Sequence, residues 1–520
     1  MSQPARLFWA IAVLVLISQI AVFGSNGSFP EPAADSSDKA KSQQRAKSSK
    51  KRKKKKAVAS VPYVVFSPSP QTPVTSASPI TINSVEALPT TPVPAARNVS
   101  AAEKTPGVHV SPTGIAIEPP LGPALGTATA GQLVISEFRV RGINGPQDEF
   151  IEIYNTTGAD HTVAAASGTG YGVAASDGVT RCSIPNGTVI PNRGHYLCVN
   201  SVGYSLGTYP AGNGTTATGD ATYTTDIPDN AGIALFNNNI GGGSYSLANR
   251  LDAVGSTSEA DTTYKEGTGY PALVTPAFNI NSSFYRDNCG KGGSITTLGA
   301  CPSGGLPIDT NNNAADFIFV DANGTSAGAG QRLGAPGPEN LSSPIQRTSV
   351  FSINLLAANV AASSPPNRVR DFTPDPPNNS SAGTLSIRRR FVNNTGANVT
   401  RLRFRVVDQT TFPAPSGFAD LRTRTSGSVV VAGINDSATC AATGAPATPP
   451  CTATVQGTTL EQAAPPANQP NGGAFNGSYS AGTVTLGTPL ANGASINLQF
   501  LLGIQQTGTF KFFINIEALP

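Results

Sequence analysis

Apolar and polar residues alternate with a period of two along several short segments of this chain. The clearest is 401–406, RLRFRV, in which each arginine is followed by an apolar residue. Successive side chains of a β-strand point to opposite faces of its sheet, so this segment predicts a strand with one buried and one basic face. The preceding segment 385–392 predicts a second strand, and NNTG at 393–396 predicts a hairpin turn that joins the two. Other predicted strands in this part of the chain are 428–431, 483–486, 496–502 and 510–516.

The first half of the chain holds two strand-like segments around a turn. Residues Leu133–Arg139 and 149–155 flank a loop that contains INGP at 143–146. Gly and Pro are abundant throughout, with 54 and 43 residues, whereas charged residues make up only 13% of the chain. Short strands separated by such turn formers predict an all-β protein. Further predicted strands here are 171–175, 179–184, 195–200, 232–236 and 251–254.

Two motifs of the first half resemble one known family. The segment that begins VISE at 134–137 and continues DEFIEIYN at 148–155 resembles the opening strands of the lamin-tail domain. The string DTNNNAADF at 309–317 is similar to one that often closes exported bacterial members of that family. The resemblance covers roughly residues 131–340 and implies an immunoglobulin-like antiparallel β-sandwich that serves as a binding module. We expect a second β-sandwich, also immunoglobulin-like, in 341–520.

The N-terminal quarter differs from the rest in composition. Residues 1–24 contain a mostly apolar stretch, 7–23, which predicts a signal peptide or a retained N-terminal membrane anchor. Ser, Thr, Ala and Pro dominate 25–130, and such a segment cannot bury enough apolar surface to offset its ordering entropy. We therefore expect a disordered, extended linker between the N-terminus and the two sandwiches.

The positive charge is confined to that linker. Residues 39–56 hold 11 Lys and Arg residues and no acid, and without them 24 basic face 31 acidic residues, a net charge of −7. The folded part is therefore not expected to bind a specific nucleic acid. The densest run is a candidate for attachment to anionic lipid, lipopolysaccharide or another envelope polymer, although it also fits a simply solvated segment or a nuclear import signal. This run consists of Lys50, Lys51, Arg52, Lys53, Lys54, Lys55 and Lys56.

The six cysteines fall into three pairs that are close in sequence. Their spacing does not match the C-x-x-C pattern of zinc or redox sites, so disulfides in an exported protein are the favoured interpretation over free buried thiols. Proximity predicts the pairs Cys182 with Cys198, Cys289 with Cys301, and Cys440 with Cys451.

Arginines form the most conspicuous charged set of the second half. Arg401, Arg403 and Arg405 share one face of their predicted strand, and the predicted hairpin would add Arg388 and Arg390. Such a face suits sulfate, phosphate or carboxylate groups of an acidic ligand. It also suits an ordinary solvated sheet face.

Oxygen-bearing side chains alternate in the closing motif of the first half. Asp309, Asn311, Asn313 and Asp316 are weak candidates for a calcium site, although the spacing fails the EF-hand pattern and also fits a turn stabilised by Asx side chains. We expect no cofactor, and calcium at these four residues is the alternative.

Evidence for catalysis is thin. The histidines His109, His161 and His195 lie in no catalytic motif, and no nucleophile elbow, zinc motif or phosphate-cradling loop is present. Glu137 and Glu152 lie on strands, where paired carboxylates suggest acid–base work, but a role within the sheet beside Arg139 or Arg141 fits them better.

The sequence therefore predicts a non-enzymatic exported protein of the cell surface or envelope. We expect it to act in adhesion, scaffolding or matrix attachment, with an envelope polymer or an extracellular matrix component as its partner. The alternatives are an accessory binding module of a secreted system that degrades polysaccharide or nucleic acid, and a secreted metal-dependent hydrolase.

Overall fold

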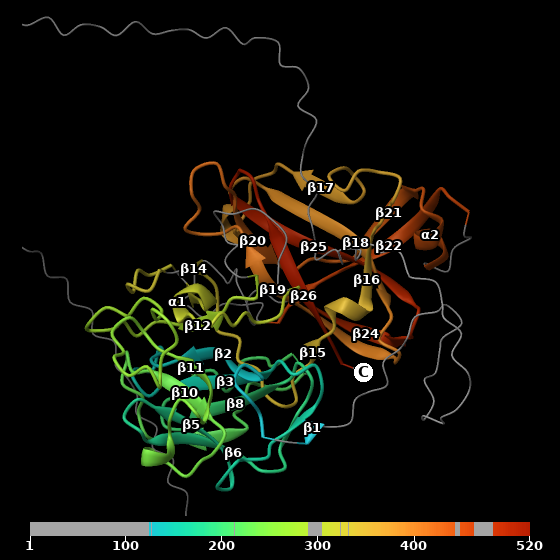
Figure 1. Ribbon diagram of the computed structural model, residues 1–520. Helices are drawn as coiled ribbons and strands as arrows, with labels where there is room; N and C mark the ends of the chain where they lie inside the picture. The colour runs from blue at the N-terminus through green and yellow to red at the C-terminus, as the bar shows by residue number, and fades with distance from the viewer. Residues whose placement is uncertain are drawn as a thin grey trace, which may run out of the picture. The chain divides into compact units, whose positions relative to one another are not determined.

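The computed structural model describes residues 124–125, 127–212, 214–289, 304–322, 324–330, 332–442, 448–461 and 482–519. Strands dominate these residues and the helices are short, so the predicted all-β class is confirmed (Figure 1). The predicted signal or anchor segment 1–24 and the basic run at 50–56 lie outside the described residues. Within the described ranges, no helix is long and apolar enough to cross a membrane. The helices are α1 (Asn313–Asp316), α2 (Ser437–Ala442) and the 3-10 turns Gly242–Ser244, Thr348–Val350 and Pro376–Asn378.

Three sheets form in the described residues of the first half. A seven-stranded sheet has the order β14-β13-β12-β2-β3-β8-β9, a four-stranded sheet the order β11-β10-β5-β6, and a small sheet the order β1-β4-β7. Their strands are β1 (Ala124–Leu125), β2 (Leu133–Arg139), β3 (Phe150–Asn155), β4 (His161–Thr162), β5 (Gly170–Ala175), β6 (Thr180–Pro185), β7 (Val189–Ile190), β8 (His195–Asn200), β9 (Ala221–Tyr223), β10 (Ile233–Phe236), β11 (Arg250–Val254), β12 (Ser282–Arg286), β13 (Phe317–Asp321) and β14 (Arg332–Leu333).

The two opening strands of the first half pair as their sequence predicts. Strands β2 and β3 are antiparallel neighbours, with Leu133 opposite Asn155 and Phe138 opposite Ile151. Every residue of both strands is buried. Protein therefore covers both faces of each strand. This is why neither strand alternates strictly between apolar and polar residues.

Two further sheets form in the described residues of the second half. One has the order β15-β26-β19-β24-β23 and the other the order β16-β18-β25-β22-β21, with β17 paired to β18 and β20 to β25. Their strands are β15 (Ile345–Gln346), β16 (Phe351–Leu355), β17 (Arg368–Asp371), β18 (Thr384–Asn393), β19 (Val399–Gln409), β20 (Asp420–Arg424), β21 (Val429–Ile434), β22 (Cys451–Gly457), β23 (Thr459–Leu460), β24 (Gly482–Leu490), β25 (Ser495–Gln506) and β26 (Phe512–Leu519).

The predicted hairpin between the segments now called β18 and β19 is wrong. Strand β18 pairs with β16, β17 and β25, whereas β19 pairs with β24 and β26. The turn after Asn393 therefore carries the chain from one sheet to the other. Both strands were located correctly. They do not pair with each other, because segments that are distant in the sequence occupy their edges.

Each half encloses a large hydrophobic core between two sheets. In the first half, Leu133 and Ile153 of the seven-stranded sheet share a cluster with Val173 and Leu235 of the four-stranded sheet. In the second half, one cluster joins residues from strands of both sheets, among them Leu385, Ile387, Leu402, Phe404 and Phe500. The alternation in β18 and β19 therefore reflects one apolar face on each strand turned toward a shared core.

The segment that connects the two halves is buried. Residues 333–340 are all buried. The backbone N–H of Gly337 donates to Oε1 of Glu137 at 3.1 Å, and that of Glu339 donates to Oε2 of Glu152 at 2.6 Å. A few residues later, β15 pairs with the C-terminal strand β26. The connection is thus held by buried hydrogen bonds on one side and by a sheet on the other.

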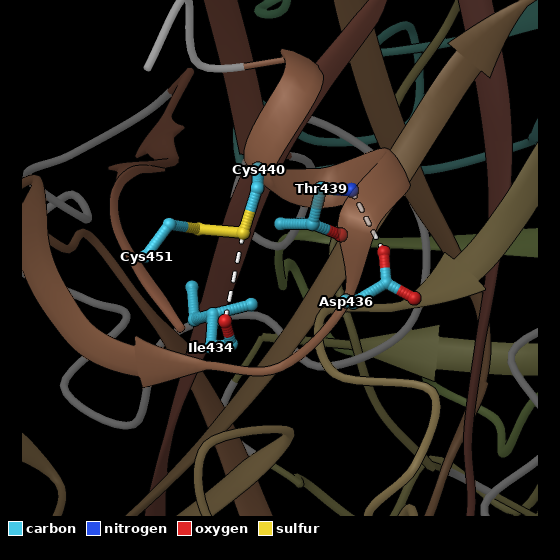
Figure 2. The surroundings of a disulfide bond; sticks show 5 residues. All are labelled: Ile434, Asp436, Thr439, Cys440 and Cys451. Atoms are coloured by element: carbon cyan, nitrogen blue, oxygen red, sulfur yellow. Dashed lines mark hydrogen bonds between the residues drawn. A yellow bond between two sulfur atoms is a disulfide. The ribbon is translucent and has the colours of Figure 1, made fainter. Parts of the chain in front are cut away.

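Two of the three predicted disulfides are present. Cys182 of β6 is joined to Cys198 of β8, which links the four-stranded sheet to the seven-stranded sheet. Cys440 of α2 is joined to Cys451 of β22 (Figure 2). The predicted pair of Cys289 with Cys301 is not described, because Cys301 lies outside the described residues.

The second disulfide ties the short helix α2 to strand β22. Figure 2 shows the sulfur of Cys440 facing the carbonyl oxygen of Ile434, at 3.5 Å, and the carboxylate of Asp436 beside the start of α2. Oδ1 of Asp436 accepts the backbone N–H of Thr439 at 2.7 Å, as a helix N-cap does. The start of α2 is therefore held by a capping hydrogen bond and the helix is tied covalently to β22.

Removing the Cys440–Cys451 bond should destabilise the protein measurably. A disulfide that closes a loop of this length restricts the unfolded chain, and its loss costs about 3 kcal/mol. We expect C440A, C451A and the double variant to lower the free energy of unfolding in urea by similar amounts, because either change breaks the same bond. Unchanged stability of the double variant under oxidising conditions would contradict the assignment.

Candidate functional site

The five candidate arginines do not form one accessible surface. Arg388 and Arg390 lie on β18 and are half-buried, whereas Arg401 of β19 is half-buried in the other sheet. Arg403 and Arg405 are buried, with Arg403 fully inaccessible. The predicted basic face is therefore wrong for Arg403 and Arg405, because protein covers the side of β19 that the sequence pattern marked as polar.

Arg403 is the centre of a buried network of charges. Its guanidinium forms ion pairs with Glu339, with Glu461 at 2.8 Å and with Glu517 at 2.6 Å. Arg405 lies 3.3 Å from Glu339 and 3.4 Å from Glu517, and it donates to the carbonyl oxygen of Gly337 at 2.6 Å. The network thus connects the segment between the two halves to strands β19 and β26. We call the group Glu152, His195, Glu339, Arg403, Arg405, Glu461 and Glu517 the charged junction.

Local register explains part of this network. Arg403 is the direct cross-strand partner of Glu517 in the antiparallel β19–β26 pair, and opposite charges at such positions attract. Glu517 is the one charged residue of the mostly apolar segment FFINIEAL, so a buried partner for it was detectable in the sequence. Glu339 and Glu461 lie in irregular segments, and no pattern pointed to them.

His195 faces the carboxylates of the junction from β8. Its Nε2 lies 3.2 Å from Glu339 and 3.7 Å from Glu152. Burial, together with the nearby Arg405 and Arg403, lowers the pKa of His195 to about 3, so the imidazole is neutral near pH 7. Burial is the largest cause that raises the pKa of Glu152 well above its usual range, and the nearby charge of Glu137 is the second. Burial also raises the pKa of Glu517.

The cavity inside the charged junction is too small for a substrate. Its volume is about 20 Å³, enough for a water molecule. A histidine beside carboxylates is a common acid–base arrangement, but the reacting atom must reach it. The groups of the junction therefore act on each other, and their arrangement holds the strands and the connecting segment in place.

Glu137 and Glu152 have the structural role that their strand positions predicted. Glu137 accepts the hydroxyl of Ser283 at 2.6 Å, and Glu152 accepts the backbone N–H of Glu339. The arginines that were expected beside them pair with aspartates, Arg139 with Asp148 and Arg141 with Asp229.

The residues considered for calcium are arranged as a turn. The side-chain amide of Asn313 accepts the backbone N–H of Gly255 and donates to the carbonyl of Ala253. Both hydrogen bonds are buried. Asp316 accepts the hydroxyl and backbone N–H of Thr310, and Asp309 accepts the backbone N–H of Asn311. The oxygens of Asp309 and Asp316 are thus directed at the local backbone, as in the Asx-turn alternative, whereas the amide of Asn313 bonds the distant segment 253–255.

One carboxylate of that turn belongs to a second buried cluster. Asp309, Asp252 and Glu266 place one oxygen each within 4.8 Å of the others. Arg286 lies among them, at 2.7 Å from Asp252 and 3.5 Å from Asp309, and Arg250 lies 3.1 Å from Glu266. Guanidinium groups already supply the positive charge that a bound cation would bring.

Glu149 directly precedes strand β3. It is a further titratable group that the sequence did not single out. It accepts the side-chain N–H of Asn200 at 2.8 Å and the backbone N–H of Ile227 at 2.7 Å. Both bonds favour the carboxylate, but burial outweighs them and raises the pKa of Glu149 to about 8. The residue is therefore protonated in the folded protein over a range in which it is ionised in the unfolded chain.

The comparisons with known proteins give no relatives for this arrangement. No protein-family model, no curated protein and no solved structure matches the chain.

Removing Arg403 should destabilise the protein strongly. The change R403M leaves three buried carboxylates with less compensating charge, and breaking a buried ion pair costs about 3–5 kcal/mol. The matched control R401M, two residues away on the same strand but half-buried, should change the free energy of unfolding by no more than about 0.5 kcal/mol. Equal, small effects of both changes in denaturant titrations would contradict the network.

Glu149 should give the stability a specific pH dependence. Its pKa is raised from 4.5 to about 8 on folding, so the folded state binds an extra proton between these values. The free energy of unfolding should therefore fall as the pH rises through this window, by on the order of a few kcal/mol. Urea titrations of E149Q should show a shallower fall, and identical slopes for E149Q and the wild type would contradict the assignment.

Proposed function

We propose that this protein is an exported, non-enzymatic attachment protein of the cell surface or envelope. In this proposal the first half is a lamin-tail-like domain, and both halves are immunoglobulin-like sandwiches. The basic linker holds the protein to an anionic envelope polymer or lipid. The β-sheet body presents loops and sheet edges to a matrix component.

The small size of the cavity in the charged junction is the observation that supports a non-enzymatic role in this proposal. The histidine and carboxylates that are suited to acid–base chemistry enclose a space of about 20 Å³ and are bonded to one another. Catalysis requires contact between such groups and a substrate. Buried side chains that bond one another and stabilise the fold suit a protein that acts through its surface.

Several features support export. Two disulfides within an all-β body are typical of an oxidising compartment. The sequence begins with a mostly apolar segment of the kind that directs secretion. The antiparallel pairing of β2 with β3 bears on the fold and not on export, and it fits the β-sandwich that the lamin-tail resemblance implies.

The basic run is the proposed attachment device, and its charge can be removed without touching the β-sheet body. We expect the full chain to sediment with lipopolysaccharide or with vesicles of anionic lipid at low salt. Replacing residues 50–56 by glutamine should weaken this binding by at least about a hundredfold, because each lysine near an anionic surface contributes about 1 kcal/mol. High salt should have the same effect on the unaltered chain.

A control and two other outcomes define the test. Replacing Lys39, Lys41, Arg45 and Lys47 removes fewer and more scattered charges and should weaken binding less. Undiminished binding by the 50–56 variant would contradict attachment through the basic run. Salt-resistant binding of one polysaccharide by that same variant would instead favour an accessory module of a degradative system.

A further inference from the structure

A pocket of about 420 Å³ lies at one end of the second hydrophobic core. Its floor is formed by core residues, and exposed residues such as Ser363 and Thr507 lie at its rim. This volume is within the range of ligand sites, about 300–1,000 Å³. The side chains that the argument uses are Arg368, Arg370, Leu385, Leu421, Ile504 and Phe510.

The sheet topology creates this pocket. Strands β17, β18, β25 and β20 are successive neighbours, and they can be followed in this order in Figure 1. Leu421 of β20 lies opposite Ile504 of β25, and Leu385 of β18 lies opposite Arg370 of β17. Leu385, Leu421 and Ile504 belong to the hydrophobic core, and Phe510 packs against it. The interior of the pocket is therefore an accessible extension of the core.

Two arginines at the pocket have no carboxylate partner in the structure's ion pairs. Nε of Arg368 donates to the carbonyl oxygen of Ser363 at 3.1 Å, and the guanidinium lies 5.9 Å from the ring centre of Phe510. Arg370 donates to the carbonyl oxygens of Thr384, Ala382 and Asp371. Among the described residues, no ion pair includes either arginine, in contrast to Arg403, which forms ion pairs with three glutamates.

The surroundings increase the cost of this positive charge. Burial lowers the pKa of both Arg368 and Arg370. Arg389 of β18 is 4% exposed, and burial together with the charge of Arg368 lowers its pKa to about 10. A negatively charged group beside Arg368 would relieve both the desolvation and the mutual repulsion of these guanidinium groups.

We propose that this pocket binds a single-chain anionic amphiphile of the alkyl carboxylate class, with the chain against Leu385, Leu421 and Ile504 and the carboxylate at Arg368 and Arg370. An apolar interior takes up the alkyl chain, and a guanidinium presents N–H donors in the geometry that a carboxylate accepts. The inference rests on the pocket alone and is independent of the proposed attachment function.

The experiment is a calorimetric titration of the full chain with octanoate, decanoate and dodecanoate below their micelle-forming concentrations. High ionic strength screens the charges of the basic run at 50–56, so that the pocket is the site observed. We expect one saturable site, with affinity rising about fourfold for each added methylene that is buried. Dodecanol should bind about tenfold more weakly than dodecanoate, because it lacks the charge that the arginines recognise.

Two variants separate the head-group and chain contributions. R368Q should weaken dodecanoate about tenfold and leave dodecanol unchanged, which a merely misfolded variant would not do. T507W places a large ring at the exposed rim and should abolish binding of both. R388Q, on the same sheet but outside the pocket, and V430W, at an exposed site of β21, should bind both ligands as the wild type does.

The proposal fails if no saturable site is found, if dodecanol binds as tightly as dodecanoate, or if acetate alone binds as tightly as dodecanoate. It also fails if T507W and R368Q retain the affinity of the wild type for dodecanoate.

Discussion

A charge that is removed from water must be paired, and this requirement at Arg403 organises much of the described structure. Its guanidinium is inaccessible to solvent and is surrounded by Glu339, Glu461 and Glu517. These partners are 64, 58 and 114 residues away in the sequence. Pairing them therefore requires that the C-terminal strand, the segment after β22 and the connection between the halves all meet at β19.

Local patterns located the strands but not their partners. The alternation at 401–406 identified β19, and the apolar runs at 496–502 and 510–516 identified β25 and β26. The same alternation suggested an exposed basic face, because a period of two separates the two sides of a strand without saying what covers each side. Here the core covers one side, and the connecting segment with its glutamate covers the other.

The hairpin error has a related cause. NNTG is a good turn sequence, and the chain does turn there, but a turn joins strands of different sheets as readily as strands of one sheet. Short-range chemistry also located two cysteine pairs correctly, since their loops are short. The contacts of His195 and Glu339 could not be inferred, because they arise between segments that approach each other only in the folded chain.

The arginines of the second half divide into two kinds. Arg403 and Arg405 are shielded from solvent and form ion pairs with carboxylates, so their charge is compensated within the fold. Arg368 and Arg370 have lost part of their solvent, and they bond carbonyl oxygens and lie over the rings of Phe510 and Phe372 without forming an ion pair among those of the described residues. The distinction separates charges that maintain the structure from charges that remain able to recognise a ligand.

The buried connection at 333–340 has a consequence for the modularity of the chain. Its backbone bonds glutamates of the first half, and its Glu339 side chain bonds arginines of the second. Neither half expressed alone would retain these partners, so a recombination event at this boundary would leave unsatisfied charge on both products. We therefore expect the two halves to fold together, and insertions to be better tolerated in the exposed loops than in the segment that joins the halves.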